Sequence, residues 1–590
     1  MKKRPFLKTA FLLLLFLLLA HLYNNRHGLP IPVIDDQSRL LVELMKTYPI
    51  DYSGTGRTLD KTIWGYDLTW ALFTLFTIFI SGYAILFRNI RPQTGKYLSA
   101  TNGLLWLGCL ITAVAFWSLP QQLFFGALFI VFLLSFLFDW RAPKPNDTRV
   151  CIIGAGISGL TVAYQLQKQG YRNITVLEKE NQIGGKCFTS NLQEQPFDLG
   201  GHEMLGGYKD LLQIADELNA PTRVSIPPLV YNHEKKQYVH FKEAATISGK
   251  YTMGQVMIAS FKYLWLVATT FRKFSQPSTG YKNVPQELTM PIDKWLEKRK
   301  LSALTDILSF VIRVQGFGQF SGSAAHLIKF MGFQNWLSLI LSGVGISKKW
   351  PRVMVLGMNN LCTRMANTVF DVRTGIQVEK INRDPAKKRG GIQVYCTATN
   401  RPPVSADNNP MIFDKLIIAM PPELPGILFL DITPKEQALF ARIEYVRFFT
   451  TLCKVQGLPA GIVASIPLNN LSAGEYTGYI KDYKAIPIAN FFTLGLNKDI
   501  TGEVVVKKIS AVLSQIPPYK GKQAKVLEFI EQKEWKYFPH FGLEATAAGA
   551  YNEMEALQSR NNTFYASSLL SFECVGNSVA YAKRLVTTHF

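Results

Sequence analysis

The chain has 590 residues, of which 48% are hydrophobic and 18% are charged, so it is long enough for several domains and its composition excludes wholesale disorder. Its formal net charge of +22 fits a surface that faces anionic lipid, and it fits equally a solvated basic surface with no specific partner. The sequence has no basic stripe interleaved with aromatic residues, so nucleic acid is not favoured as a partner. The seven scattered cysteines never take C-x-x-C spacing, so the sequence predicts neither a metal site nor a disulfide framework.

Four apolar segments of the first 145 residues each approach the ~20 residues that a helix needs to cross a bilayer, namely 6–22, 68–87, 98–119 and 123–140. The first could be a signal peptide, but no small-residue cleavage site follows it, so we interpret it as an uncleaved anchor. Basic residues in the flanking loops put the rest of the chain in the cytoplasm. The sequence thus predicts a four-helix transmembrane region in 1–145 of an integral membrane protein, in the inner membrane if bacterial, with the lipid bilayer as a partner.

A strand, a glycine-rich turn and a helix follow this region. Val150–Ile153 is an apolar run typical of a buried parallel strand, and Gly154, Gly156 and Gly159 follow it in G-x-G-x-x-G spacing. The first glycine allows a tight turn, the second lets backbone N–H groups approach a pyrophosphate, and the third lets the next helix pack on its strand. That helix begins near Ser158 and offers free N–H groups to a diphosphate. The pattern predicts a dinucleotide site for NAD or FAD, against the alternative of glycines that serve packing alone.

A second strand ends at Glu178, where a carboxylate is expected to accept hydrogen bonds from an adenosine ribose. Gly184, Gly185 and Lys186 follow six residues later. This Gly-Gly-basic element resembles that of the flavin amine oxidase and phytoene desaturase superfamily, in which it lies against the FAD diphosphate. The resemblance therefore favours FAD over NAD as the cofactor.

Later segments carry the same resemblance. The run that ends in Gly200, Gly201 and His202 resembles the superfamily's second glycine turn, which passes under the isoalloxazine. Residues 415–420 resemble the strand that returns to the cofactor, and the strand, loop and helix of 562–590 resemble the element that closes the FAD site. Many members have Gly and an acidic residue after that strand, where this chain has serines, so the resemblance implies weaker FAD binding.

Within the superfamily the chain resembles polyenoic fatty acid isomerases and cyclopiazonate-type oxidocyclases over roughly residues 148–590. This resemblance rests on the GGKC run at 184–187, the FDLGGHEM run at 197–204 and the SFE…YAKRLV ending. It implies an α/β fold, in which a Rossmann-type FAD-binding domain accompanies an α+β substrate domain. We expect the FAD-binding domain in 146–245, 356–425 and 546–590, a helical cap in 246–355 and the substrate domain in 426–545.

The glycine turn and the resemblance together give the candidate cofactor-binding residues Gly154, Gly156, Ile157, Ser158, Gly159, Glu178, Lys179, Gly184, Gly185, Lys186, Gly200, Gly201, His202, Val378, Ala419, Ser567, Ser568 and Val575. Val378 falls where the superfamily holds the adenine through its backbone. Two catalytic candidates are His202, which a structural histidine would also explain, and Lys454, which falls near the lysine that bonds flavin N5 through water in flavin amine oxidases.

We expect a membrane-anchored FAD-dependent oxidoreductase that moves a hydride between flavin N5 and a hydrophobic small molecule, such as a lipid or polyene. If the hydride returns to another position of the substrate, the enzyme is a redox-neutral fatty acid isomerase. If the hydride passes to an acceptor such as oxygen or a quinone, the enzyme is an oxidase or dehydrogenase, such as an amine oxidase. A non-catalytic flavin-fold scaffold or sensor and an NAD-dependent enzyme remain alternatives. The apolar segment 253–271 predicts either a buried helix, which we favour, or one lying on a bilayer.

Overall fold

The computed structural model describes residues 146–590, apart from 227, 233–234, 318–319, 344, 348, 350, 370, 385, 388, 400–409, 467–474 and 496–498. No helix in the described part of the chain is long and apolar enough to cross a bilayer. The longest described helix, α9 (Met253–Ala268), has 16 residues and spans ~24 Å, which is shorter than the ~30 Å hydrocarbon core.

The predicted fold class is therefore corrected to the α/β architecture of the described residues, without the four-helix transmembrane region. The predictions of an integral membrane location and a cytoplasmic flavin domain are not retained, because no described helix supports them. The predicted spans, 6–22, 68–87, 98–119 and 123–140, lie outside the described residues.

Three separated stretches of the chain build one five-stranded parallel sheet, here called the cofactor sheet, in the order β19-β13-β1-β2-β9. Its strands are β1 (Asn146–Ile153), β2 (Tyr171–Leu177), β9 (Asp371–Arg373), β13 (Lys415–Ile418) and β19 (Thr563–Tyr565). The central strands end in short apolar runs, such as Val150–Ile153 and Leu416–Ile418, that are buried almost completely. Such runs are typical of parallel strands covered on both faces.

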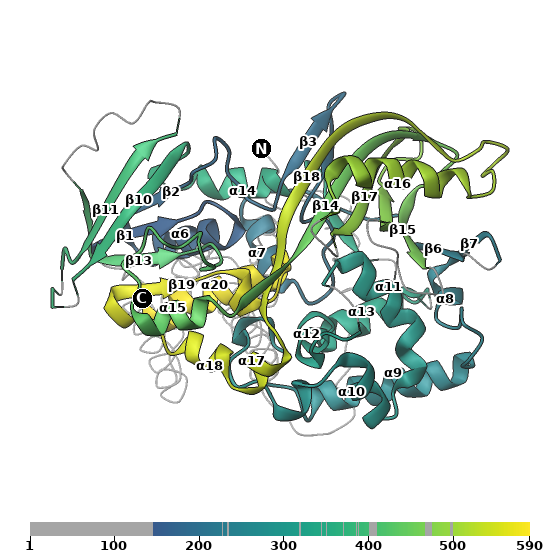
Figure 1. Cartoon of the computed structure of the whole chain (residues 1–590), viewed down its shortest axis with the longest axis horizontal. Coiled ribbons are helices and arrows are strands. Elements are labelled where there is room, and N and C mark those ends of the chain that lie inside the picture. Colours follow the sequence, from purple (N-terminus) through teal and green to yellow (C-terminus); the bar gives the residue numbers. More distant parts are fainter. Residues whose placement is uncertain are drawn as a thin grey trace, which may run out of the picture. The chain divides into compact units, whose positions relative to one another are not determined.

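Two helices cover one face of the cofactor sheet. α6 (Ile157–Lys168) follows β1 through the glycine turn, α20 (Val575–His589) follows β19, and the two helices pack against each other (Figure 1). Leu160 of α6 and Val579 of α20 share a core with Val150 and Ile152 of β1. Cys151 and Ile153, which alternate with these residues along β1, point to the other face of the sheet. The strand is therefore buried on both sides.

A small antiparallel sheet of β10 (Ile376–Arg383), β11 (Ile392–Ala398) and β12 (Met411–Phe413) is tied to the cofactor sheet by a buried ion pair. Arg383 donates to both oxygens of Glu436, each over 2.9 Å, and to Asp431 over 2.6 Å. Glu436 lies in α15 (Pro434–Phe440) and also accepts a bond of 3.0 Å from Tyr565 of β19. The carboxylate therefore joins three elements that are distant in sequence.

Replacement of Glu436 by glutamine should lower stability at neutral pH by about 2 kcal/mol, because the buried Arg383 would keep only Asp431 as a carboxylate partner. Burial by itself raises the pKa of Glu436, but the bonds from Arg383 and its neighbours outweigh it and lower that pKa to about 2. The stabilisation from the ionised Glu436 is fully present at pH values above the ordinary carboxyl pKa, and it is lost as the pH falls toward 2. Melting curves of both proteins should converge in acid, whereas exposed Glu297→Gln should match wild type throughout.

The second large sheet is mainly antiparallel and has seven strands in the order β18-β14-β17-β16-β15-β6-β7. They are β6 (Leu229–Asn232), β7 (Gln237–His240), β14 (Ile443–Gln456), β15 (Gly461–Ile466), β16 (Tyr476–Lys481), β17 (Ile488–Gly495) and β18 (Lys525–Phe541). β6 pairs in parallel with β15, so residues before the helical region belong to the same sheet as those after it. α16 (Gly502–Ser514) packs on this sheet.

A group of helices lies below this sheet in the view of Figure 1: α8 (Phe241–Ala244), α9, α10 (Ile292–Lys298), α11 (Thr305–Gln315), α12 (Ala324–Phe330) and α13 (Phe333–Gly343). One face of α9 is buried, as favoured from the sequence, through residues such as Val256 and Tyr263. The opposite face leaves Ile258, Phe261 and Trp265 exposed by 71%, 63% and 63%. In the described part of the chain, α9 therefore has a core face and an exposed apolar face.

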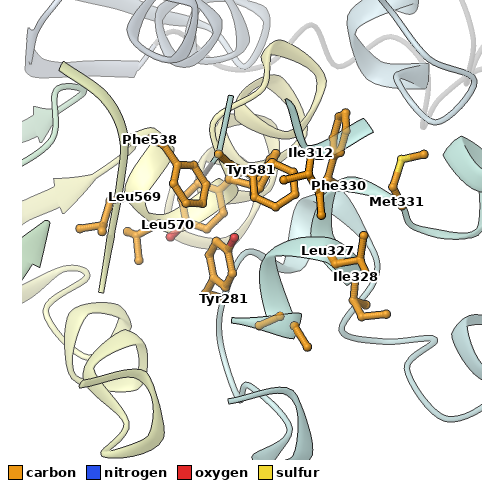
Figure 2. Close-up of a cluster of buried hydrophobic side chains, with 14 of the residues drawn as sticks. Tyr281, Ile312, Leu327, Ile328, Phe330, Met331, Phe538, Leu569, Leu570 and Tyr581 are labelled. Atoms are coloured by element: carbon orange, nitrogen blue, oxygen red, sulfur yellow. The ribbon is translucent and has the colours of Figure 1, made fainter. Parts of the chain in front are cut away.

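The helical group is joined to the C-terminal segment by an aromatic and aliphatic core. Figure 2 shows Tyr281, from the connection between α9 and α10, and Phe330 of α12 gathered with Phe538 of β18 and with Leu570 and Tyr581 from the chain end. The remaining elements are β3 (Thr189–Leu192), β4 (Gln195–Asp198), β5 (Thr222–Val224), β8 (Arg352–Met354), α7 (Lys209–Glu217), α14 (Met358–Ala366), α17 (Leu543–Ala547), α18 (Ala550–Glu555), α19 (Ser568–Ser571) and the short 3-10 helices η1 (Pro277–Thr279), η2 (Gln286–Leu288), η3 (Ser302–Leu304) and η4 (Arg560–Asn562).

Candidate active site

A cavity of about 960 Å³ begins at the carboxyl ends of β1, β2 and β13 and continues between the helical group and the seven-stranded sheet. In an open parallel sheet, ligands bind outside the carboxyl ends of the strands, where loops and helix N-termini meet. The cavity therefore combines a dinucleotide position at the cofactor sheet with a second chamber under the large sheet.

The N-terminus of α6 faces this cavity through the glycine turn. Gly154 has a φ of +104°, which only glycine adopts without strain, and it donates to Leu177 over 2.8 Å. A Cβ on Gly156 would approach nothing closer than the Gly184 carbonyl oxygen, 4.0 Å away, and Gly156 lines the cavity. A Cβ on Gly159 would lie 2.0 Å from the Gly154 carbonyl oxygen, so this third glycine serves packing.

Glu178, which is predicted to bind an adenosine ribose, directly follows β2 and lines the cavity. Its carboxylate accepts a bond of 2.8 Å from the Ala155 amide and one of 3.0 Å from the Glu180 amide. Each carboxylate oxygen has a second lone pair, which the ribose hydroxyls of a bound dinucleotide would fit.

A clamp joins the Gly-Gly-basic element to the chain end. Lys186 donates to both oxygens of Glu573 over 3.1 Å, and the Ser568 hydroxyl donates to Glu573 over 2.8 Å. The amide of Gln315 in α11 bonds the Glu573 carbonyl oxygen and the Tyr537 hydroxyl, each over 2.9 Å. Segments separated by hundreds of residues thus meet at one wall of the cavity.

The second glycine turn is packed between this clamp and α20. A Cβ on Gly200 would lie 1.7 Å from the Lys186 carbonyl oxygen, and one on Gly201 would lie 2.6 Å from Val575 Cγ2. His202 and Glu203 follow directly and face the cavity. The turn therefore needs two glycines to bring the next two side chains into position.

The N-terminus of α20 also faces the cavity. Its first residue, Val575, and the preceding Cys574 line the wall, and the Cys574 sulfur lies within reach of the backbone N–H groups of Gly576 and Asn577. The positive end of the helix dipole therefore stabilises negative charge that develops beside it. Burial raises the pKa of the Cys574 thiol to about 11, so this cysteine is not a thiolate at neutral pH.

The second chamber is mostly apolar. Its walls come from the helical group and from the faces of β14, β15, β16, β17 and β18, through Phe241, Phe310, Val311, Val314, Leu339, Phe448, Ile462, Ile480, Phe492, Trp535 and Tyr537. Such walls exclude water and fit a large hydrophobic ligand better than a small charged one.

Most of the predicted site residues come together in this cavity, namely Gly154, Gly156, Ile157, Ser158, Glu178, Gly184, Gly185, Lys186, Gly200, Gly201, His202, Ala419, Ser568 and Val575. The structure places five others elsewhere: Gly159, Lys179, Val378, Ser567 and Lys454. Val378 is buried in β10, and Lys454 is exposed on β14. The Ser567 hydroxyl is buried and has no hydrogen-bond partner in the described structure.

Several residues at the site or directly behind it were not predicted from the sequence. Of these residues, Glu203 could have been predicted, because it directly follows the second glycine turn in the sequence. Asp482 lies 280 residues from its partner His202, and Gln315 lies on α11 of the helical group. No sequence pattern of neighbouring residues therefore predicted that they belong to the site.

The residues present fit FAD. The open cradle at Gly156 leaves room for a diphosphate, the left-handed Gly184 and Gly185 let the backbone pass close to it, and Glu178 has acceptor capacity for a ribose. The free N–H groups of α6 would supply donors for the diphosphate, and the N-terminus of α20, which lines the same cavity, would stabilise negative charge on the flavin. In the described part of the chain, no group of three or more His, Cys, Asp or Glu side chains could hold a metal ion.

The fold and the cavity define a dinucleotide-binding α/β protein with a second, apolar chamber. Residues 157–456, just over half of the chain, match the family described as flavin containing amine oxidoreductase, and the chain belongs to this family. Its members use FAD, so the predicted resemblance, the FAD cofactor and the enzyme class are confirmed. The alternatives of an NAD-dependent enzyme and of a non-catalytic scaffold or sensor are set aside.

Known relatives extend this match along the chain. An uncharacterised protein, R656, from Acanthamoeba polyphaga mimivirus is 22% identical over 79% of this chain and 98% of its own length. The FAD-dependent oxidoreductase oblC of Cochliobolus heterostrophus is 21% identical over 71% of this chain and 86% of its own. Among solved structures, the CLA-producing fatty acid isomerase from P. acnes is similar with a TM-score of 0.64 and 23% identity, over 75% of this chain and 99% of that one. This last likeness shows the shared fold.

Proposed function

We propose that the enzyme transfers a hydride between its FAD and a hydrophobic substrate of the lipid or polyene type. The observation that carries this proposal is the continuity of one cavity, which runs from the dinucleotide cradle at Gly156 into the apolar chamber under Phe492 and Trp535. Bound FAD supplies the hydride acceptor and donor, and the protein supplies orientation, dipoles and a dry environment.

Each part of the wall has a separate task in this proposal. The N-termini of α6 and α20 bind negative charge on the diphosphate and beside the flavin. The clamp of Lys186 and Glu573 fixes the chain end against the Gly-Gly element, so both halves of the site stay in register. The aromatic walls hold an apolar chain and exclude water from it.

The substrate class has support from two sides. The walls of the second chamber are apolar, and a relative of the same fold is a fatty acid isomerase by name. A polyunsaturated fatty acid is therefore the first substrate to test. A hydride returned to the same chain would move double bonds, whereas a hydride passed to oxygen would leave an oxidised product.

Purified protein that contains FAD should be incubated anaerobically with a polyunsaturated fatty acid, and the products separated by mass spectrometry. We expect either isomers with shifted double bonds or bleaching of the flavin with stoichiometric oxidation. Putrescine and a small aromatic amine serve as controls, because the apolar chamber should give them no turnover. Turnover of these amines with no effect of any hydrophobic compound would contradict the proposal.

A further inference from the structure

A cluster of ionisable side chains lies at the second glycine turn, and two of them, His202 and Glu203, line the cavity. His202 Nε2 lies 3.1 Å from both carboxylate oxygens of Asp482, which follows β16. The guanidinium of Arg223 on β5 lies 3.6 Å from the same carboxylate. The side chains of His202 and Asp482 are only 8% and 11% exposed, so their interaction is shielded from solvent.

Two atoms of this cluster have no hydrogen-bond partner in the described structure, although both are buried. They are His202 Nδ1 and Glu203 Oε1. Both residues line the cavity, and the Ser225 hydroxyl bonds the Glu203 carboxyl. Buried polar atoms are nearly always hydrogen-bonded, so two unpartnered atoms on consecutive residues of one cavity wall indicate a polar group of a ligand.

The protonation states are set by the surroundings. Burial acts to lower the pKa of His202, but the adjacent Asp482 outweighs it and raises that pKa to about 9, so the imidazole carries a charge and its Nδ1 carries a proton. Burial raises the pKa of the Glu203 carboxyl to about 7. The charged or titratable groups around these two side chains are Asp198, Tyr208, Arg223, Asp482 and Tyr483.

We propose that Glu203 exchanges a proton with a hydroxyl group of the substrate, while His202, held by Asp482, donates its Nδ1–H to the same oxygen. In this step the substrate O–H bond breaks, an O–H bond forms at Glu203 Oε1, and the electron pair stays on the substrate oxygen. The positive charge of His202 stabilises that oxygen. His202 Nδ1 supplies a donor and Glu203 Oε1 an acceptor, which together match the single O–H of an alcohol or phenol, so the structure assigns the site to a hydrophobic hydroxyl compound.

This assignment rests on the proposed function, because the hydroxyl compound would occupy the same cavity as the hydrophobic substrate. Glu203 is the catalytic residue and contacts the substrate. Asp482 is a positioning residue, since it acts only through His202. The two proposals can fail separately: turnover of hydrophobic compounds without proton exchange at Glu203 would overturn only this one.

The test uses 4-nitrophenol, which is ionised at mildly alkaline pH, as the probe for the holoenzyme. Calorimetric binding in two buffers of different ionisation enthalpy measures proton uptake. Because the phenolate and an ionised Glu203 must share one proton, wild type should take up about one proton per bound probe. Glu203→Gln should take up none, and Glu297→Gln, which removes an exposed carboxylate outside the cavity lining, should behave as wild type.

Two further measurements separate recognition from structure. Asp482→Asn should weaken phenolate binding about tenfold while its FAD content stays at the wild-type level, because the imidazolium loses its carboxylate. The methyl ether 4-nitroanisole should bind without proton uptake in all variants. Failure of wild type to bind the phenol, or equal proton uptake by wild type and Glu203→Gln, would overturn the assignment.

Discussion

Replacement of Gly156 by valine should leave a folded protein that no longer retains FAD. A Cβ at this position meets no protein atom closer than 4.0 Å, so the fold itself does not exclude the valine side chain. Its methyl groups would instead occupy the space that the diphosphate needs above the N-terminus of α6. We expect at least about a 100-fold loss of FAD affinity, because the backbone N–H groups can no longer reach the phosphates.

The measurement is the flavin-to-protein ratio after purification, together with a titration of FAD into the stripped protein. The matched control is Gly254→Val on α9, where a Cβ would lie 3.9 Å from Thr252 Oγ1 and the helix lies away from the cavity lining. That variant should keep wild-type FAD content. A Gly156→Val protein that binds FAD as wild type does would remove the assignment of the diphosphate site.

Replacement of Gly200 by alanine should destabilise the protein by about 3 kcal/mol and lower its FAD content as well, because the added methyl group has no space. The new Cβ would lie 1.7 Å from the carbonyl oxygen of Lys186, which is backbone and cannot rotate away. Two backbone bonds of 2.9 Å, from Leu199 to Phe188 and from Gly201 to Lys186, hold the turn against that strand of chain. The clash can therefore be relieved only if the backbone of the turn moves away from Lys186 and these hydrogen bonds break.

Thermal unfolding of the holoenzyme measures this effect, and a fall in Tm of roughly 5 °C or more is expected. Gly254→Ala is the control, since it adds the same methyl group where nothing is crowded and where alanine favours the helix. An unchanged Tm for Gly200→Ala would show that the turn is not packed against Lys186 in solution. If the variant is stable but has lost FAD, the turn contacts the cofactor without supporting the fold.

The cofactor half of the site was predictable because its signals are local. Glycine spacing after a buried strand, an acidic residue at the end of the next strand and a Gly-Gly-basic element each depend on a few consecutive residues. These residues line one cavity in the structure. Val378 and Lys454 were placed by analogy alone, and the structure puts the first in the small sheet and the second on the exposed side of β14.

The amino-acid sequence by itself determined the family, the cofactor and the glycine turns that we expect to bind it, because those features require particular residue types at fixed short spacing. Only the tertiary structure decided which side chains meet in the substrate chamber. His202 contacts Asp482, which lies 280 residues away in the sequence, and Lys186 contacts Glu573, which lies 387 residues away. A contact between residues so far apart leaves no periodicity in the chain, since it depends on how sheets and helices pack and not on local conformation.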